Sequence, residues 1–321
     1  MNNSNIVKIL FILSLPLFLY SCGGGGGGSS SSPVPINFTE TQSVTRGLVA
    51  SYRPGSAGDR PDVHAEEIGF ESEEVFGGFN WAQNADTDIF SVVSDTLYSG
   101  TDLDAQLTPE HITSGPVTAS SEHTLASTNY TYGYYDSSIA QNVYVVVGIP
   151  TNYPNQTWIY WDNTNYAADV DYSLNFAVTG KPLLYASLPS SGTATYTGGM
   201  EGYYSRKTDS FNGHLHGATN FSVNWGNETI SGSFTNIKEN NGGTITNFNN
   251  LTMPSTSIGS GNGGIASFTG DLQGTGFTTS IFTKINGAFF GANAESIGGT
   301  WEIQNNGSTG AGAGYFAAGK N

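Results

Sequence analysis

Two histidines separated by one residue have the spacing in this sequence that best suits metal chemistry. His214 and His216 lie in the stretch HLHGATNFSVNW, where apolar and polar residues alternate. Because side chains alternate between the two faces of a β-strand, both imidazoles would lie on one face, and imidazole is a common ligand of transition metals. The same alternation places that face in solvent, where most polar side chains lie. The sequence therefore favours two ordinary surface histidines over a metal site.

The motifs of several enzyme classes are missing from the sequence. It contains no G-x-S-x-G, no H-E-x-x-H and, with one cysteine, no paired-cysteine metal spacing. Gly259, Gly261 and Gly264 satisfy G-x-G-x-x-G, but no helix pattern follows them, and a dinucleotide site needs that helix. With no visible pair of nucleophile and base, the sequence predicts a binding protein and not an enzyme.

Cys22 is the only cysteine, and six glycines and four serines follow it. A lone thiol cannot form an intramolecular disulfide, and a Gly/Ser tract behaves as a flexible linker. Residues 1–21 resemble a signal peptide, because a short positively charged start precedes the apolar run ILFILSLPLFLY. The sequence LYSC that ends this segment resembles the bacterial lipobox, in which the cysteine is lipidated and becomes the new amino terminus. The alternative is an ordinary secretory signal with an incidental cysteine.

The lipobox resemblance predicts a membrane anchor at Cys22, made of a diacylglyceryl group and an acyl chain such as palmitate. Two or more acyl chains anchor a protein stably, whereas one does so only marginally. Gly23 stands where an aspartate would retain the protein at the inner membrane, so the outer membrane is favoured. Residues 22–35 would then be the lipidated cysteine and a tether with a root-mean-square reach of ~20 Å.

Composition narrows the partners and the fold class. The net charge of −16 at pH 7 repels phosphate backbones, so we expect no nucleic-acid partner. Aromatic residues make up 12% of the chain and can build a core, which argues against disorder. Asn, Thr, Ser, Gly and Tyr are abundant and helix formers are sparse, which is typical of an all-β chain with many turns.

From about Ala186 the sequence becomes a regular series of short strands. In residues 213–225, Leu215, Phe221 and Val223 alternate with polar residues, and TISGSFTN, ASFTGDL and IGGTWEI repeat the pattern. Alternation with one polar face marks antiparallel sheet, and glycines on the apolar face leave room for aromatic rings inside a small barrel. We expect an eight-stranded antiparallel β-barrel with strands near 192–200, 213–225, 228–237, 244–253, 264–273, 280–290, 296–304 and 312–319.

Three segments of this region resemble the barrel domain of the transferrin-binding protein B superfamily: LPSSGTATYTGGMEG, FSVNWGNETISGSF and INGAFFGANAESIGGTWEI. That superfamily includes surface lipoproteins, related solute-binding proteins, factor H-binding protein and haemophilin-type haemophores. The resemblance implies a barrel domain at 189–321 and, before it, a β-rich handle-like domain at 36–188 that binds the ligand or partner. The last segment is the most specific, because it matches the family motif at Gly287, Ala288, Phe289, Gly291, Ala294, Glu295, Gly298 and Gly299.

The handle-like region has no motif of its own but is rich in aromatic residues and histidines. Flat aromatic rings suit a flat apolar ligand. Because haemophores of the superfamily ligate haem iron through histidine, the resemblance makes haem a candidate cofactor. The alternative for each histidine is an ordinary loop position. The candidate ligand-binding residues are His64, His111, His123, the alternating Tyr130, Tyr132 and Tyr134 of NYTYGYYD, and Trp158 and Trp161.

We therefore expect a lipid-anchored outer-membrane protein, exposed on the surface of a Gram-negative cell, that captures a nutrient ligand or iron source for uptake. Haem or an iron-carrying host protein would be that source. The resemblance implies two further partners, a surface lipoprotein assembly modulator and a TonB-dependent receptor. The alternative is an adhesin, or an immune-evasion protein that binds a host factor and has no small ligand.

Overall fold

The computed structural model describes the residues in strands and the connections near the barrel. All of them belong to Pro33–Asn321, one of the two units into which the chain divides. Cys22, the tether and the three histidines of the handle-like region lie outside the described residues. The described ranges are 42–46, 48–52, 79–84, 89–94, 103–107, 112–118, 127–136, 141–150, 152–153, 155–164, 172–206, 213–261, 264–275, 283–304 and 310–321.

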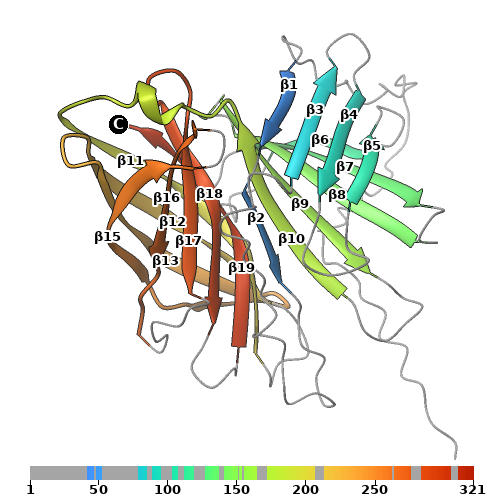
Figure 1. Cartoon of the computed structure of the whole chain (residues 1–321). Coiled ribbons are helices and arrows are strands. Elements are labelled where there is room, and N and C mark those ends of the chain that lie inside the picture. The colour runs from blue at the N-terminus through green and yellow to red at the C-terminus, as the bar shows by residue number, and fades with distance from the viewer. Residues whose placement is uncertain are drawn as a thin grey trace, which may run out of the picture. The chain divides into compact units, whose positions relative to one another are not determined.

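The strands of the first half form two antiparallel sheets (Figure 1). The four-stranded sheet has the order β1 (Gln42–Arg46), β3 (Phe79–Asn84), β4 (Ile89–Ser94) and β5 (Leu103–Leu107). The six-stranded sheet has the order β2 (Leu48–Tyr52), β10 (Tyr172–Gly180), β9 (Gln156–Thr164), β8 (Gln141–Pro150), β7 (Ser127–Asp136) and β6 (Ile112–Thr118). None of the described residues forms an apolar helix of membrane-spanning length.

Eight strands of the second half close into an antiparallel barrel, as the alternation predicted (Figure 1). Closure is complete because the first strand pairs with the last, and the second pairs with the third. The barrel consists of β11 (Thr193–Arg206), β12 (Gly213–Asn224), β13 (Thr229–Asn241), β15 (Leu251–Ser260), β16 (Ala266–Asp271), β17 (Lys284–Phe290), β18 (Ser296–Gln304) and β19 (Gly310–Lys320).

The predicted strand at 244–253 is wrong in its bounds. The structure has a short strand β14 (Thr244–Asn247) that pairs with β13 alone and adds nothing to the closed barrel. The barrel strand β15 runs on to Ser260, through Pro254. Here Ile230 faces Thr256 and Gly232 faces Met253, so two residues of β15 oppose one of β13. Such a bulge tolerates a proline that a regular ladder would exclude.

Apolar side chains from alternate positions of the strands fill the barrel interior. Trp301 is fully buried there, and its indole Nε1 donates a hydrogen bond to the backbone oxygen of Tyr315 at 3.2 Å. A Cβ atom at Gly202 of β11 or Gly314 of β19 would collide with the Trp301 ring. The same relation holds between Gly232 and Phe221. Glycine opposite an aromatic ring is thus the packing rule of this interior, as the sequence predicted.

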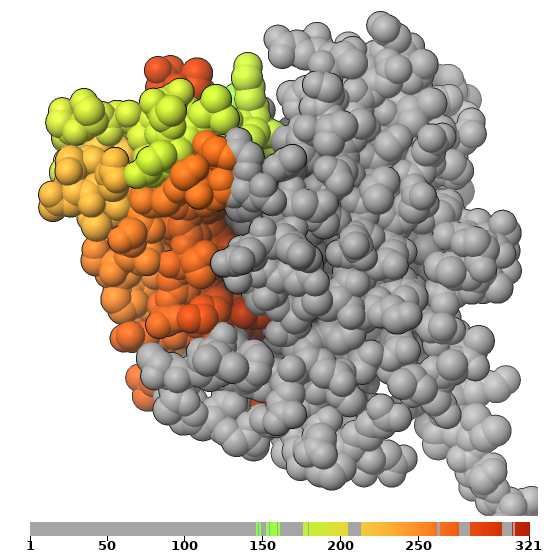
Figure 2. Space-filling model, in the orientation of Figure 1, coloured from blue at the N-terminus to red at the C-terminus, as the bar shows by residue number. Residues whose placement is uncertain are grey.

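The segment that joins β10 to β11 is bonded to one rim of the barrel (Figure 2, yellow-green). The Leu183 amide donates to the Phe289 oxygen at 2.8 Å, and the Ala266 amide donates to the Leu183 oxygen at 2.8 Å. A 3-10 turn, η3 (Tyr185–Ser187), follows, and the Tyr185 hydroxyl donates to Glu228 Oε2 at 2.6 Å. The end of β10 is therefore fixed to the barrel rim.

Candidate functional site

The six-stranded sheet packs one of its faces on the outer wall of the barrel. Trp158, Tyr160, Phe176 and Val178 of β9 and β10 form one buried cluster with residues of the barrel wall. Trp158 pairs with Val178 and Tyr160 with Phe176 across the sheet, so all four lie on the same face. The barrel contributes Ala288 and Phe290 of β17 and Ala313, Tyr315 and Ala317 of β19, with Tyr203 of β11 packed against them.

Five rings hold this contact together, and we call them the aromatic seam: Trp158, Tyr160, Phe176, Tyr203 and Tyr315. Trp158 and Tyr315 stack with their ring centres 4.5 Å apart and an interplanar angle of 13°. Phe176 lies 6.2 Å from Tyr315, and Tyr160 lies 5.9 Å from Tyr203. Aromatic pairs in such arrangements stabilise a structure by ~0.5–1.5 kcal/mol each beyond the area that they bury. The seam therefore ties the sheet to the barrel.

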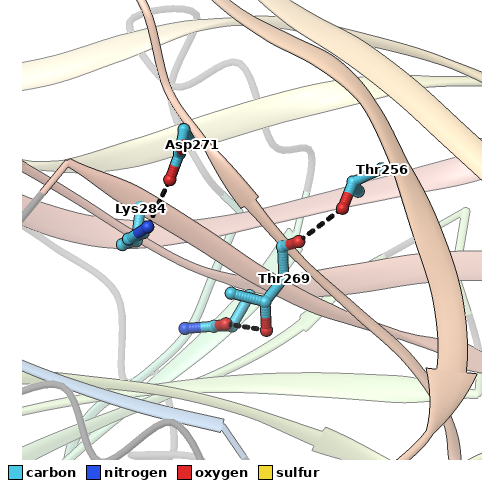
Figure 3. A network of polar contacts seen from close by, with 5 residues as sticks. Thr256, Thr269, Asp271 and Lys284 are labelled. Carbon is cyan, nitrogen blue, oxygen red and sulfur yellow. Dashed lines mark hydrogen bonds and ion pairs between the residues drawn. The ribbon is translucent and has the colours of Figure 1, made fainter. Parts of the chain in front are cut away.

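A row of polar side chains crosses the barrel wall beside and beneath the seam. The Tyr315 hydroxyl donates to Glu201 Oε2 at 3.0 Å. Burial, followed by the nearby Glu201 carboxylate, raises the pKa of Tyr315 well above its usual value. Further along, the Thr269 hydroxyl donates to Asn286 Oδ1 at 2.5 Å (Figure 3). Residues of the row face one another on six adjacent strands: His216, Glu201, Tyr315, Thr300, Asn286 and Thr269.

The two histidines of β12 lie at one end of this row and are half-buried, not solvated as the sequence indicated. Their ring centres are 5.7 Å apart, and the Tyr203 ring covers His214 at 5.3 Å. His214 Nε2 lies 3.9 Å from Glu201 Oε2. Within the described ranges, no three His, Cys, Asp or Glu residues are arranged to hold a metal ion. The pair thus continues the seam onto the next strand, and a metal site is not supported.

Glu302 is a buried carboxyl group that the sequence did not reveal. It is 1% exposed, although the alternation of IGGTWEI places it on the polar face. Lys284 and Ala313 face it across the two neighbouring strands, and Lys284 forms an ion pair with Asp271 (Figure 3). Burial raises the pKa of Glu302 well above its usual value, and the Lys284 ammonium offsets only part of that shift.

One sequence signal for the covered wall exists in retrospect. The outer faces of β18 and β19 carry Gly298, Ala313 and Ala317 where an exposed barrel would carry long polar side chains. Small residues let another layer approach closely, and the Gly298 position lies against Gln156 and Val178 of the sheet. Tyr203 and Tyr315 of the seam, and Glu201 of the polar row, were not predicted, because in the sequence each looks like an ordinary strand residue.

The aromatic residues predicted to bind a ligand divide between the two faces of the six-stranded sheet. Tyr130, Tyr132 and Tyr134 face Val147, Val145 and Val143 across the ladder, and Trp161 faces Val145 on the other side. These register positions alternate with those that pack on the barrel. Trp158, three residues before Trp161, lies on the barrel-facing side and is 5% exposed. Trp158 is therefore a packing residue in this structure, not part of an open aromatic surface.

An all-β protein in which a β-sheet packs on the outer wall of a closed eight-stranded barrel is the class that this architecture defines. Residues 188–320 match the family model described as the C-lobe and N-lobe beta barrels of Tf-binding protein B. This part of the chain is a transferrin-binding protein B-like barrel domain. A comparison with curated protein sequences finds no match.

Solved structures of transferrin-binding protein B are similar over most of this chain. A mutant of the vaccine antigen from Haemophilus parasuis is 14% identical, with 86% of this chain and 45% of that chain covered and a TM-score of 0.44. The isotype 1 protein from Neisseria meningitidis serogroup B is 13% identical, with 86% and 44% covered and a TM-score of 0.42. Intact Ap-TbpB is 12% identical, with 86% and 46% covered and a TM-score of 0.46. The chain spans about half the length of these structures.

Proposed function

We propose that this protein is a surface lipoprotein that binds an iron-carrying host protein. The observation that carries the proposal is the match of residues 188–320 to the barrels of Tf-binding protein B. The barrel would serve as the scaffold, because its interior is filled by its own side chains and leaves no lumen for cargo. Binding would then fall on the sheets that precede it.

We place the binding surface on the face of the six-stranded sheet that points away from the barrel. Tyr130, Tyr132, Tyr134 and Trp161 occupy this face by register, and we call them the ligand face. Tyrosine and tryptophan dominate the binding energy of many protein interfaces because they bury large areas at low entropic cost. Ala177 of β10 and Thr157 of β9 share this face and are buried, so the candidate surface is confined to β7 and the Trp161 end of β9.

The anchor completes the proposal. Cys22 would hold the protein in the outer membrane through its lipid, and residues 22–35 would let the folded part reach a large partner. A surface lipoprotein assembly modulator would export the protein, and a TonB-dependent receptor would take up the iron. Replacing Cys22 by Ala should move the protein from the detergent phase to the aqueous phase. Equal partitioning of both forms would contradict the anchor.

Binding is tested with the mature chain immobilised against a panel of iron-loaded and iron-free transferrin and of haemoglobin. We expect retention of one iron-carrying member. A Tyr132→Ala/Trp161→Ala variant should lose at least ~30-fold in affinity, as residues of a binding hot spot do. Thr246→Ala, an exposed change on β14, is the matched control and should bind as the wild type does. Failure to retain any member, together with adhesion to host cells, would favour the adhesin alternative.

Haem is the second candidate cargo, and it rests on the superfamily resemblance. The predicted axial ligands His64, His111 and His123 lie outside the described residues. Titration of the mature chain with haem should give a saturable Soret shift, and replacing the three histidines by alanine should change the visible spectrum most. Nonsaturating adsorption, or an identical spectrum of the triple variant, would exclude haem and leave the protein partner.

A further inference from the structure

Buried polar atoms without a hydrogen-bond partner gather where the six-stranded sheet meets the barrel wall. Among the described residues they include Gln156 Oε1 from the sheet and several side chains of β17 and β18. Leaving a buried donor or acceptor unpaired disfavours the closed state. We call five of these residues the polar strip: Gln156, Asn286, Ser296, Thr300 and Glu302.

The polar strip and the aromatic seam divide the contact between them. The seam lies over β11 and β19 and is packed ring against ring. The strip follows the outer face of β18, where Ser296, Thr300 and Glu302 occupy alternate positions around Gly298. Asn286 faces Thr300 from β17, and its Oδ1 is already bonded to Thr269, which leaves the Nδ2 group turned toward no partner within the described part. Among the described residues, the seam has one such unpaired atom, Trp158 Nε1, and the strip has five, so the strip is the poorly satisfied side of the contact.

Within the described residues, the backbone hydrogen bonds that join the end of the sheet to the barrel lie at one rim. The chain leaving β10 is bonded to the barrel rim at Lys181 and Leu183, beside Phe289 and Gly291. Glu302 lies six residues along β18 from Ser296, which is ~20 Å from that rim at the usual rise of a strand. At the Glu302 end, on the level of Ala313, the contact consists of side chains packed on Tyr203, so it can loosen there while the rim stays bonded.

Glu302 has little charge around it to compensate an ionised carboxylate. Strands β2 and β10 pack against β18 and contain no acid or base other than the phenols Tyr52 and Tyr172. On the barrel, Lys284 faces Glu302 but is shared with Asp271. The other buried carboxyl group of the contact, Glu201, accepts a hydrogen bond from the Tyr315 hydroxyl. The closed contact therefore suits Glu302 in its neutral form.

We propose that Glu302 is a proton-operated latch: its neutral form holds the six-stranded sheet against β17 and β18, and its ionisation loosens that side of the contact. This device is independent of the proposed function. Burial raises the pKa of Glu302 in the closed state, so the closed state binds the proton more tightly than an open one. Closure is then complete below the ordinary pKa of about 4.5 and weakens as the pH rises toward the raised value. Within that window the ratio of closed to open molecules falls up to ~10-fold per pH unit.

Hydroxyl-radical footprinting of the mature chain at several pH values from 5 to 8 tests the latch. Mass spectrometry would measure oxidation of Phe290, Trp158 and Tyr315 at the contact, relative to Trp301 and Phe316 in the barrel interior. In the wild type we expect oxidation at the contact to rise with pH by up to ~10-fold per unit, at Tyr315 before Phe290, because Phe290 lies at the bonded rim. Glu302→Gln carries no titrating proton and should remain protected at every pH.

Two further variants keep the test decisive. Lys284→Gln leaves Glu302 intact and removes the ammonium that favours its ionised form, so the rise should continue to a higher pH and reach a higher level than in the wild type. Glu228→Gln makes the same acid-to-amide change at an exposed position on the rim and should keep the wild-type rise. The latch is refuted if wild type and Glu302→Gln are oxidised equally at every pH, or if Trp301 and Tyr315 rise together. It is refuted equally if the oxidation of Lys284→Gln levels off at the same pH and to the same extent as that of the wild type.

Discussion

The inner and outer surfaces of the barrel wall differ in how their side chains are packed and paired. The inner surface is apolar and complementary, with glycines of one strand receiving the aromatic rings of another. The outer surface under the sheet mixes stacked rings with buried carboxyl and amide groups, several of them without a hydrogen-bond partner among the described atoms. We expect full packing to let the barrel fold without the sheet, and the mixed surface to make the contact with the sheet depend on pH. The comparison predicts large, condition-independent effects inside and smaller, pH-dependent effects outside.

The largest effect is expected inside, at Trp301. Its fully buried ring lies over Gly202 and Gly314, so Trp301→Ala leaves a cavity that the closed barrel cannot fill. We expect a loss of ~3–5 kcal/mol in the free energy of unfolding, measured by urea denaturation. A loss below ~1 kcal/mol would mean that the interior is not the close-packed core described here.

Trp158 tests the outer surface with the same chemical change. Trp158→Ala removes the ring that stacks on Tyr315, and we expect a loss of ~3 kcal/mol that is confined to the sheet. The barrel should keep its own unfolding transition, seen by circular dichroism at higher urea. If the whole chain unfolds in one earlier transition instead, the two surfaces are not separable.

Glycine substitutions measure how tightly the interior is packed. Gly314→Ala places a methyl group against the Trp301 ring and the backbone of β11, and we expect ~1–3 kcal/mol of destabilisation. Gly259→Ala adds the same methyl group where no atom lies within 4 Å, and its stability should stay within ~0.5 kcal/mol of the wild type. Equal effects at both positions, read from thermal or urea unfolding, would remove the packing argument.

Glu302 should make the stability of the wild type depend on pH. Its pKa is raised by burial in the folded state, so the folded protein binds this proton more tightly than the unfolded chain. The wild type should therefore lose up to ~1.4 kcal/mol per pH unit, relative to Glu302→Gln, as the pH rises above 4.5 through the raised value. Urea unfolding of both forms from pH 5 to 8 measures the difference, and parallel curves would show that the carboxyl group is not desolvated.

The smallest effect belongs to the ion pair between Lys284 and Asp271. Their side chains are 30% and 49% exposed, so solvent screens most of their attraction. Asp271→Asn should change the free energy of unfolding by ~0–1 kcal/mol, and less in high salt. A change of several kcal/mol in the same unfolding experiment would place this pair in the core of the contact, against the comparison.

The buried positions of the inner surface could be predicted from the sequence, and those of the outer surface could not. Period-two alternation in residues 213–225 identified the buried positions of β12, because a strand shows one face to a core that the same segment partly builds. Strand bounds were missed at β15, where the bulge at Pro254 hides the alternation. In the rest of the barrel the strands show regular alternation, so their buried positions can be recognised in the sequence.

The candidate site depends on which layer covers the polar outer face of the barrel strands. The alternation of apolar and polar residues does not indicate whether such a layer exists. Thr300 and Glu302 read as solvated, yet the sheet buries both. The sequence analysis assigned Trp158 and Trp161 to one aromatic surface. They are three residues apart on a strand, so their positions lie on opposite faces of the sheet. Contacts between distant segments decide both outcomes, so neither burial of a carboxyl group nor the aromatic seam was predictable from local pattern.

Expression of residues 189–321 alone tests most directly whether the barrel is self-sufficient. A closed barrel has no free sheet edge, and the interior cluster comes almost entirely from this segment. We predict a cooperative thermal melt and a β-type circular dichroism spectrum for the isolated fragment. A molten fragment that gains structure only when residues 36–188 are added would contradict the account, because the outer contact would then be a condition of folding.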